Sequence, residues 1–150
     1  MKSMTVLSIA ALTIVAMSGV ANAAISGTQT WKMVNDQLQN TSNGQTLCMT
    51  GVAFQQATMG VCGSNPGMQN IRQVTFEMNG ALRLDAHPDY AYTPLDGKIY
   101  IREYDTVVSN WDYINGQLKK VDSDGVLKCL DIEGGKNVQG AKLYLAACTQ

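Results

Sequence analysis

An internal repeat is the feature of this sequence that most constrains its fold. Residues 31–38 and 111–118 share Trp, Asn, Gln and Leu at a constant offset of 80 residues. The match continues from 45–50 to 126–131, and 76–85 form a weaker copy that keeps an aromatic residue, Asn-Gly, Leu and a final Asp. A repeat found three times at roughly 36 to 44 residues predicts one structural unit used three times around a shared core.

The first 23 residues have the pattern of a secretory leader. Lys2 precedes an apolar and small-residue run from Val6 to Val20, and Ala21-Asn22-Ala23 has the small-x-small form of a signal-peptidase site. We therefore expect residues 1–23 to be a signal peptide, and residues 24–150 to form one secreted or periplasmic domain. A membrane anchor is disfavoured because the apolar run is short and no basic stop-transfer residues follow it.

The charge of the chain argues against two classes of partner. Without Lys2, ten basic residues remain against twelve acidic ones, and no basic block or stripe occurs. Nucleic acid is not expected as a partner, because its binding depends on a basic surface. Binding to an anionic membrane by charge is equally unsupported, and we expect no transmembrane segment in the mature domain.

The four cysteines are expected to form two disulfides. All of them follow the leader, in a chain directed to an oxidising compartment, and three pairings are possible. Cys48 and Cys129 occupy equivalent places in the repeat, so each should pair within its own unit. The expected bridges are Cys48 with Cys62 and Cys129 with Cys148.

No metal site or cofactor is expected. The thiols are widely spaced and His87 is the only histidine. The run 122–125, Asp-Ser-Asp-Gly, is similar to the start of a calcium loop. However, Val126 and Leu127 stand where an oxygen ligand and the obligatory glycine belong, which excludes an EF-hand.

Short segments rich in aromatic and β-branched residues, separated by Gly and Asn, predict an all-β fold. Four strands are expected in each unit. They lie at 31–35, 37–40, 46–50 and 57–62 in the first unit; at 74–79, 81–85, a stretch interrupted by Pro88 and Pro94, and 98–104 in the middle unit; and at 111–115, 117–121, 126–132 and 141–148 in the third.

Twelve short strands in three units match a β-trefoil, a barrel with three hairpins capping one end. Residues 29–35 are expected to close the barrel by completing the third unit. Trp31, Phe76 and Trp111 recur at equivalent positions and are expected in the core. An open sandwich is the alternative fold, but it would leave the threefold spacing unexplained.

Three segments resemble a known family. Residues 127–131, Leu-Lys-Cys-Leu-Asp, and 140–148, Gly-Ala-Lys-Leu-Tyr-Leu-Ala-Ala-Cys, resemble the Cys-Leu-Asp and Gly-x-x-Val-x-Leu-x-x-Cys frame of ricin-B-type lectin repeats. Gln29-Thr30-Trp31 is similar to the Gln-x-Trp signature of these repeats. The resemblance covers essentially all of residues 24–150, and it implies binding of galactose-like or other glycans in a shallow pocket on each unit.

The resemblance also implies which residues bind the sugar. Such a pocket needs a carboxylate for two adjacent hydroxyls, an aromatic ring against the apolar face of the sugar, and an amide. By position, the carboxylates are Asp131 in the third unit and Asp85 in the middle one, whereas the first unit has Thr50. Both aspartates have a structural alternative, since a recurring Asp at a strand end can simply cap a turn.

The aromatic position departs from the family pattern. This chain has Ala146 there in the third unit and Arg102 in the middle one. Tyr144 lies two residues before Ala146, on the same strand face, and is the expected substitute. In the middle unit the candidates are Tyr90, Tyr92 and Tyr100. The amide candidates are Asn137, Gln139 and Gln29.

Two function classes follow from these observations. The first is a secreted carbohydrate-binding lectin domain, with cell-surface or extracellular glycans as partners. The second is an interaction protein without sugar binding, either a subunit resembling the A and C components of cytolethal distending toxins, with a separate toxin or enzyme subunit as partner, or a trefoil protease inhibitor. An enzyme is not expected, because no Ser or Cys nucleophile is matched to His87.

Overall fold

The computed structural model describes residues 24–72, 80–106 and 109–149. Within these ranges the chain is mostly β-structure, with ten strands and one short α-helix. None of the helices in this part of the chain has the length and apolar character needed to cross a membrane. The expected leader and Phe76 lie outside the described residues.

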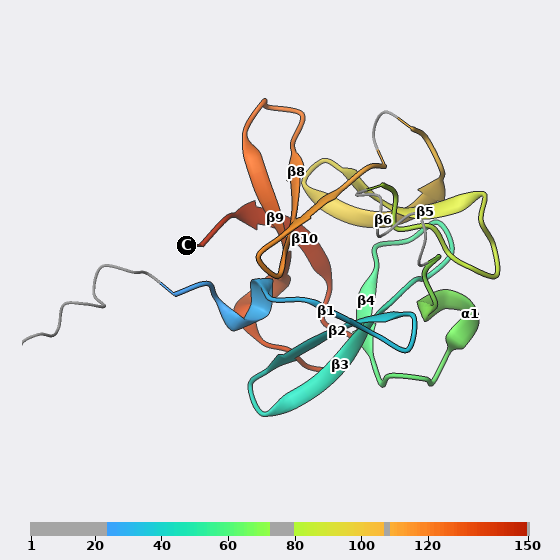
Figure 1. Cartoon of the computed structure of the whole chain (residues 1–150), viewed down its shortest axis with the longest axis horizontal. Coiled ribbons are helices and arrows are strands. Elements are labelled where there is room, and N and C mark those ends of the chain that lie inside the picture. Colours follow the sequence, from blue (N-terminus) through green and yellow to red (C-terminus); the bar gives the residue numbers. More distant parts are fainter. Residues whose placement is uncertain (1–23, 73–79, 107–108, 150) are drawn as a thin grey trace, which may run out of the picture.

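A four-stranded antiparallel sheet holds the first unit, in chain order (Figure 1). A short 3-10 helix, η3 (Gly27–Gln29), precedes it and the helix α1 (Pro66–Gln69) follows it. Asn35 and Asp36 form the first turn with φ of 52° and 65°, a conformation that Asn and Asp tolerate better than most residues. The strands of this four-stranded sheet are β1 (Lys32–Val34), β2 (Gln37–Ser42), β3 (Gln45–Thr50) and β4 (Thr58–Gly60).

A six-stranded antiparallel sheet joins the middle and third units in the order β5-β6-β10-β9-β8-β7. The sheet curls, and the β8–β9 hairpin extends from one end of the molecule (Figure 1). A 3-10 helix, η4 (Glu133–Gly135), follows β9. The strands are β5 (Tyr90–Leu95), β6 (Lys98–Glu103), β7 (Asp112–Ile114), β8 (Gln117–Val121), β9 (Leu127–Ile132) and β10 (Leu143–Ala147).

The expected strands of the first and third units are confirmed to within a few residues at their ends. The middle unit differs. Residues 74–79 lie outside the described part of the chain, and 81–85 supply isolated bridges rather than a strand. Pro94, expected to interrupt a strand, lies inside β5 opposite Ile99. Because β5 is at the edge of its sheet, a missing backbone N–H is tolerated there.

One hydrophobic core connects the two sheets. Trp31 and Trp111 are its largest side chains and are almost fully buried, as expected. The sheets are joined where β4, β6 and β10 meet. Ala57 donates its N–H to the Ile99 carbonyl at 2.7 Å, and Leu143 donates to the Ala57 carbonyl at 3.0 Å.

The three units are linked in a ring by one recurring backbone hydrogen bond. Trp31 donates its N–H to Gly116 of the third unit at 2.8 Å, and Trp111 donates to Gly80 of the middle unit at 3.0 Å. Between them, Ile71 donates to the Asp36 carbonyl of the first unit at 2.8 Å. Ile71 therefore holds the position in the middle unit that the sequence assigned to Phe76.

The N-terminal segment contacts the third unit by a different route from the one expected. Strand β1 pairs with β2 of its own unit, and Gln29 lies in η3 rather than in a strand. The residues before β1 make the connection to the third unit. The Trp31 indole Nε1 donates to the Leu130 carbonyl at 3.1 Å, in addition to the backbone bond to Gly116.

Both disulfides form within units, which confirms the expected pairing. Cys48 bonds Cys62, and Cys129 bonds Cys148. Loops of these lengths stabilise the folded state by roughly 3 kcal/mol each in the chain-entropy estimate. The middle unit has Ala91 at the position of Cys48 and Cys129, because Ala91 lies two residues before Thr93, as Cys48 does before Thr50 and Cys129 before Asp131.

We predict that Trp31→Ala destabilises the protein by about 3 to 5 kcal/mol, because the change opens a large cavity and removes the indole bond to Leu130. Urea unfolding of the oxidised protein measures this loss. Val121→Ala, at an exposed position, is the control and should cost less than about 0.5 kcal/mol. Equal effects of the two substitutions would mean that the N-terminal segment is not part of the core.

Candidate functional site

The buried side-chain amide of Gln29 connects Asp131 to the backbone at the end of the third unit. Gln29, only 1% exposed, donates from Nε2 to Asp131 Oδ2 at 2.9 Å and to the Ala147 carbonyl at 2.8 Å. Its Oε1 accepts from the Thr149 N–H at 2.9 Å and from Gln117 Nε2 at 3.1 Å. The expected Gln29 and Asp131 are thus brought together, but as partners of each other.

The first unit contains the same arrangement around a residue that sequence reasoning missed. Gln69 donates from Nε2 to Thr50 Oγ1 at 2.9 Å and to the Val61 carbonyl at 3.0 Å. Its Oε1 accepts from the Gly63 N–H at 3.0 Å, as Gln29 does from Thr149. Thr50 therefore stands in the place of Asp131, as the sequence predicted.

A similar cluster, with a hydroxyl in place of the glutamine amide, occurs in the middle unit. The hydroxyls of Ser109 and Thr93 lie 3.1 Å apart, and Ser109 Oγ accepts from the Asp105 N–H at 3.1 Å. Thr93, rather than Asp85, is therefore the middle-unit counterpart of Asp131. Gln29, Gln69 and Ser109 are spaced 40 residues apart, each two residues before a core residue. This spacing is the signal that could have revealed them.

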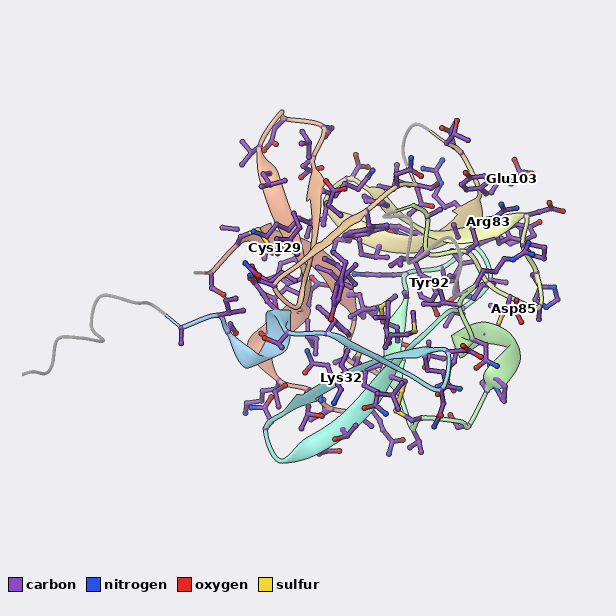
Figure 2. All side chains as sticks on the ribbon, in the orientation of Figure 1. Lys32, Arg83, Asp85, Tyr92, Glu103 and Cys129 are labelled. Carbon is purple, nitrogen blue, oxygen red and sulfur yellow. A yellow bond between two sulfur atoms is a disulfide. The ribbon has the colours of Figure 1, made fainter. Side chains whose placement is uncertain are left out.

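Asp85 consequently does not occupy the repeat position of Asp131, and its expected role in sugar binding stays a prediction. Its side chain is exposed, and its N–H is bonded to the Asn70 carbonyl at 2.8 Å. Figure 2 shows it beside α1, on the opposite side of the molecule from Cys129. Arg83 forms a bridge with Ala91 of β5, as Lys119 of β8 pairs with Cys129 of β9, so Asp85 lies one segment earlier in its unit than Asp131 does.

Tyr144 lies next to Asp131, as expected. The two residues are directly opposite in the β9–β10 ladder, so their side chains share a face of the sheet. Burial raises the pKa of the Tyr144 phenol, and the charges of Asp131 and Glu133 raise it further. Asp131 itself is 9% exposed, and its Oδ1 accepts from the Ile132 N–H at 2.7 Å. The carboxylate is therefore largely committed to the fold.

The other two amide candidates do not join this cluster. Asn137 is buried and donates from Nδ2 to the carbonyls of Asn40 and Gln45, at 2.9 and 3.1 Å. It attaches η4 and the following loop to the β2–β3 hairpin, which is a structural task. Gln139 is exposed in the next turn. Neither is part of a site with Asp131.

The middle unit carries a recessed polar surface. Strand β6 points Ile99 and Ile101 into the core and alternates them with Tyr100 and Arg102, which face outward. Tyr100 is opposite Thr93 and thus repeats the position of Tyr144. A hollow of about 500 Å³ lies over this face, lined by Phe54, Thr93, Leu95, Tyr100, Ile101, Arg102, Glu103, Tyr104 and Asp105.

Phe54 stands at the edge of this hollow in an uncommon conformation. Its side chain is 68% exposed, and its φ of 59° is in the left-handed region, which bulky residues rarely adopt. The ring meets Tyr90 edge-on, with centroids 5.4 Å apart. Its loop is held in place, since Gln55 N–H donates to Val52 and Ile101 N–H donates to the Gln55 carbonyl. Sequence reasoning gave no signal for this displayed ring.

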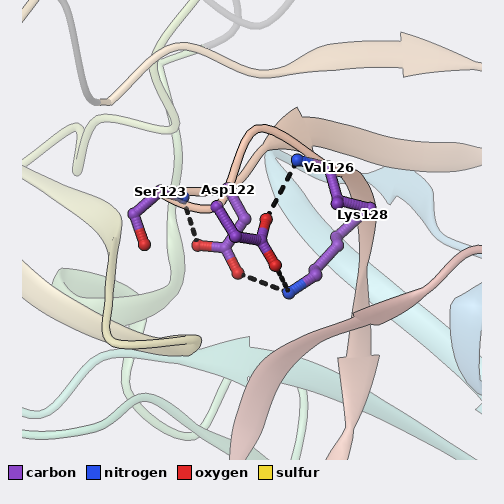
Figure 3. Close-up of polar contacts among 5 residues, drawn as sticks. Asp122, Ser123, Val126 and Lys128 are labelled. Atoms are coloured by element: carbon purple, nitrogen blue, oxygen red, sulfur yellow. Dashed lines mark hydrogen bonds and ion pairs between the residues drawn. The ribbon is translucent and has the colours of Figure 1, made fainter.

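The two aspartates of the run after β8 share an ion pair with one lysine of the chain. Lys128 Nζ lies 2.8 Å from Asp122 Oδ2 and 3.0 Å from Asp124 Oδ2 (Figure 3). Hydrogen bonds from Lys128 and from the backbone lower the pKa of both aspartates, and both carboxylates raise the pKa of Lys128.

Within the described ranges, no group of three His, Cys, Asp or Glu side chains could hold a metal ion.

We predict that Gln29→Leu destabilises the protein more than Gln69→Leu does. The first change removes a hydrogen bond to a buried carboxylate, worth about 1.5 to 3 kcal/mol, and the second removes one to a hydroxyl, worth about 0.5 to 1.5 kcal/mol. Thermal unfolding of both variants measures the difference. The reverse order would indicate that Asp131 does not depend on the Gln29 amide.

We predict that Lys128→Met destabilises the protein at neutral pH and that this loss shrinks as the pH falls below about 4. The depressed pKa of the two aspartates contributes stability above their unfolded values, and that stability is lost as acid protonates them. Unfolding measured from neutral to acid pH tests this. Lys136→Met, on an exposed residue, is the control; a pH-independent loss in Lys128→Met would point to lost packing instead.

Comparisons with known proteins found no relative of this chain. No family model, curated protein or solved structure matches this chain. The resemblance of segment 127–148 to lectin repeats therefore stays a prediction. The function must be inferred from the chain's own residues, in particular from the Asp131 cluster and the hollow over Tyr100.

Proposed function

We propose that this chain is a secreted carbohydrate-binding protein, a ricin-B-like lectin domain on a β-trefoil. The observation that carries the proposal is the hollow of about 500 Å³ over β6. It combines tyrosine rings with the guanidinium of Arg102 and the carboxylate of Glu103. Rings that stack on a sugar, with donors and acceptors for its hydroxyls, are the groups that carbohydrate binding requires.

Two recurring interactions support the trefoil. The backbone bonds of Trp31, Ile71 and Trp111 link each unit to the hairpin turn of another, in a cycle of three. The polar side chain two residues earlier also recurs in all three units, as Gln29, Gln69 and Ser109. A pseudo-threefold barrel accounts for both patterns with one explanation, whereas an open sandwich does not.

The middle unit is the main sugar site in this proposal, and the third unit is the secondary one. In the hollow, the Tyr100 ring receives the apolar face of the sugar, Arg102 donates to its oxygens, and Glu103 accepts from its hydroxyls. In the third unit, Tyr144 and the remaining exposed part of Asp131 offer a shallower surface. The first unit pairs Thr50 with Thr58 and therefore has no ring at this position.

A protein-binding subunit without sugar binding is the second candidate function, in the manner of a toxin A or C component. Two observations favour it. Thr50 and Thr93 replace the aspartate of the third unit, so two of the three units lack the carboxylate that the lectin resemblance implies. Phe54 exposes an apolar ring on a backbone held in place by hydrogen bonds.

A glycan array followed by calorimetric titration tests the proposal. We predict a monosaccharide affinity near 1 mM, or roughly −4 kcal/mol, which two occupied units would increase through avidity. Tyr100→Ala should weaken binding by up to about tenfold, because stacking of this kind is worth about 0.5 to 1.5 kcal/mol. Tyr144→Ala should weaken it less, and Ile114→Ala, at an exposed position of β7, should leave it unchanged.

Each alternative outcome has a definite meaning. If Tyr144→Ala has the larger effect, the main site lies in the third unit. If neither tyrosine matters to a glycan that the protein binds, the lectin resemblance does not identify the site. If no glycan binds, the protein-binding subunit becomes the better candidate.

A further inference from the structure

Two further hollows flank Tyr90, next to the proposed sugar site. One, of about 180 Å³, is lined by the side chains of Phe54, Met68, Leu84 and Ile101, with Ala53 and His87, in addition to Tyr90. The other, of about 300 Å³, is lined by Asp89, Tyr90, Glu103 and Tyr104. Tyr100 and Arg102 line neither hollow, although four lining residues also border the sugar site: Phe54, Ile101, Glu103 and Tyr104.

The first hollow has the size and chemistry of a pocket for one ring. A cavity of roughly 150 Å³ lined by apolar side chains holds a benzene molecule. Phe54 forms one wall, and its left-handed backbone keeps the ring out of the core and against Tyr90. A strained, displayed residue beside a pocket favours a binding role, because folding alone gains little from it.

The second hollow is suited to a cation. Asp89 and Glu103 both line it, and neither carboxylate has an ion-pair partner among the described residues. Tyr90 and Tyr104 add ring surfaces, to which organic cations are attracted. Arg83 lies over the Tyr104 ring, 4.2 Å from its centroid, and donates from Nε to the Pro88 carbonyl at 2.7 Å. It fixes that ring without lining the hollow; Figure 2 shows Arg83 and Glu103 on the same side of the molecule.

We propose that these hollows together bind a segment of a partner protein in which an aromatic side chain lies next to an arginine or lysine. The ring enters the apolar hollow, the cation enters the acidic one, and Tyr90 forms the wall between them. Charge complementarity selects this occupant over an apolar or an acidic one. The site adjoins the proposed sugar site and shares Glu103 with it, but its diagnostic residue, Asp89, borders only the acidic hollow.

The experiment uses three capped dipeptides and the disulfide-bonded protein labelled with ¹⁵N. N-acetyl-Phe-Arg-amide is the probe; citrulline in place of Arg removes the charge at constant shape, and Ala in place of Phe removes the ring. We expect the probe to shift the amide signals of Tyr90, Asp89 and Tyr104. The citrulline peptide should bind about three- to fivefold more weakly, as an exposed ion pair allows, and the Ala peptide about tenfold or more.

Asp89→Asn is the matched protein variant. It should reduce the preference for Arg over citrulline, with Glu103 supplying the remainder, while leaving the affinity of the citrulline peptide unchanged. Asp96→Asn, in the β5–β6 turn and outside both hollows, should keep the preference, and Asn tolerates the left-handed φ of 53° at that position. Higher salt should weaken only the Arg peptide.

Three results would overturn the proposal. They are equal binding of the Arg and citrulline peptides by the wild type, signal changes centred on Tyr100 instead of Tyr90, and no saturable binding of the probe at concentrations well above about 1 mM. Because the peptides contain no sugar, none of these results bears on the lectin proposal. Glycan binding that survives in Asp89→Asn would confirm that the two sites are separate.

Discussion

The assembly of the three units depends on the buried polar side chain that lies two residues before each unit's first core residue. Gln29, which precedes Trp31, bonds Asp131 of the third unit, and Gln69, which precedes Ile71, bonds Thr50 of the first unit. Each amide also bonds the backbone on both sides of a disulfide cysteine. Gln69 contacts the residues flanking Cys62, and Gln29 contacts those flanking Cys148. An amide that supplies donors and an acceptor at one buried point satisfies groups that would otherwise cost about 1 to 3 kcal/mol each. The fourth strand of the unit is thereby fixed to the start of the next one.

The middle unit has a reduced version of this arrangement, which accounts for the hollows there. Ser109 is shorter than glutamine and bonds only Thr93 and the Asp105 N–H. Tyr104, which precedes Asp105, stands where the other two units have the disulfide cysteines Cys62 and Cys148. The chain after β6 is therefore held by neither a glutamine side chain nor a disulfide. Side chains at that end therefore project outward and leave recesses between them. Two of the departures from the repeat, Thr93 and Tyr104, line the hollow over β6.

Most strands of the first and third units could be predicted, because alternating apolar residues and Asn-Gly turns specify both pairing and register. The middle unit could not be placed correctly from its aromatic residue and its aspartate. Ile71, an aliphatic residue, continues the core position of the two tryptophans, and Thr93 continues that of Asp131. Ile71 keeps the burial and the backbone hydrogen bond of its position, and Thr93 keeps a side-chain hydrogen bond, although both residue types differ from those in the other units. Asp131 with Tyr144, and Tyr100 with Arg102, could be named as candidates from the sequence. The hollow over Tyr100 could not be predicted, because residues from distant segments, such as Phe54, also line it.

The uneven distribution of the disulfides also implies an uneven resistance to local opening. Two units have their ends cross-linked, so partial unfolding within them gains little chain entropy. The middle unit has no such restraint, and it is the segment expected to open first, with the fastest amide hydrogen exchange. It is also the unit that carries the recessed surfaces. A ligand bound there would therefore stabilise the weakest part of the molecule, and occupancy would be coupled to the lifetime of the whole fold.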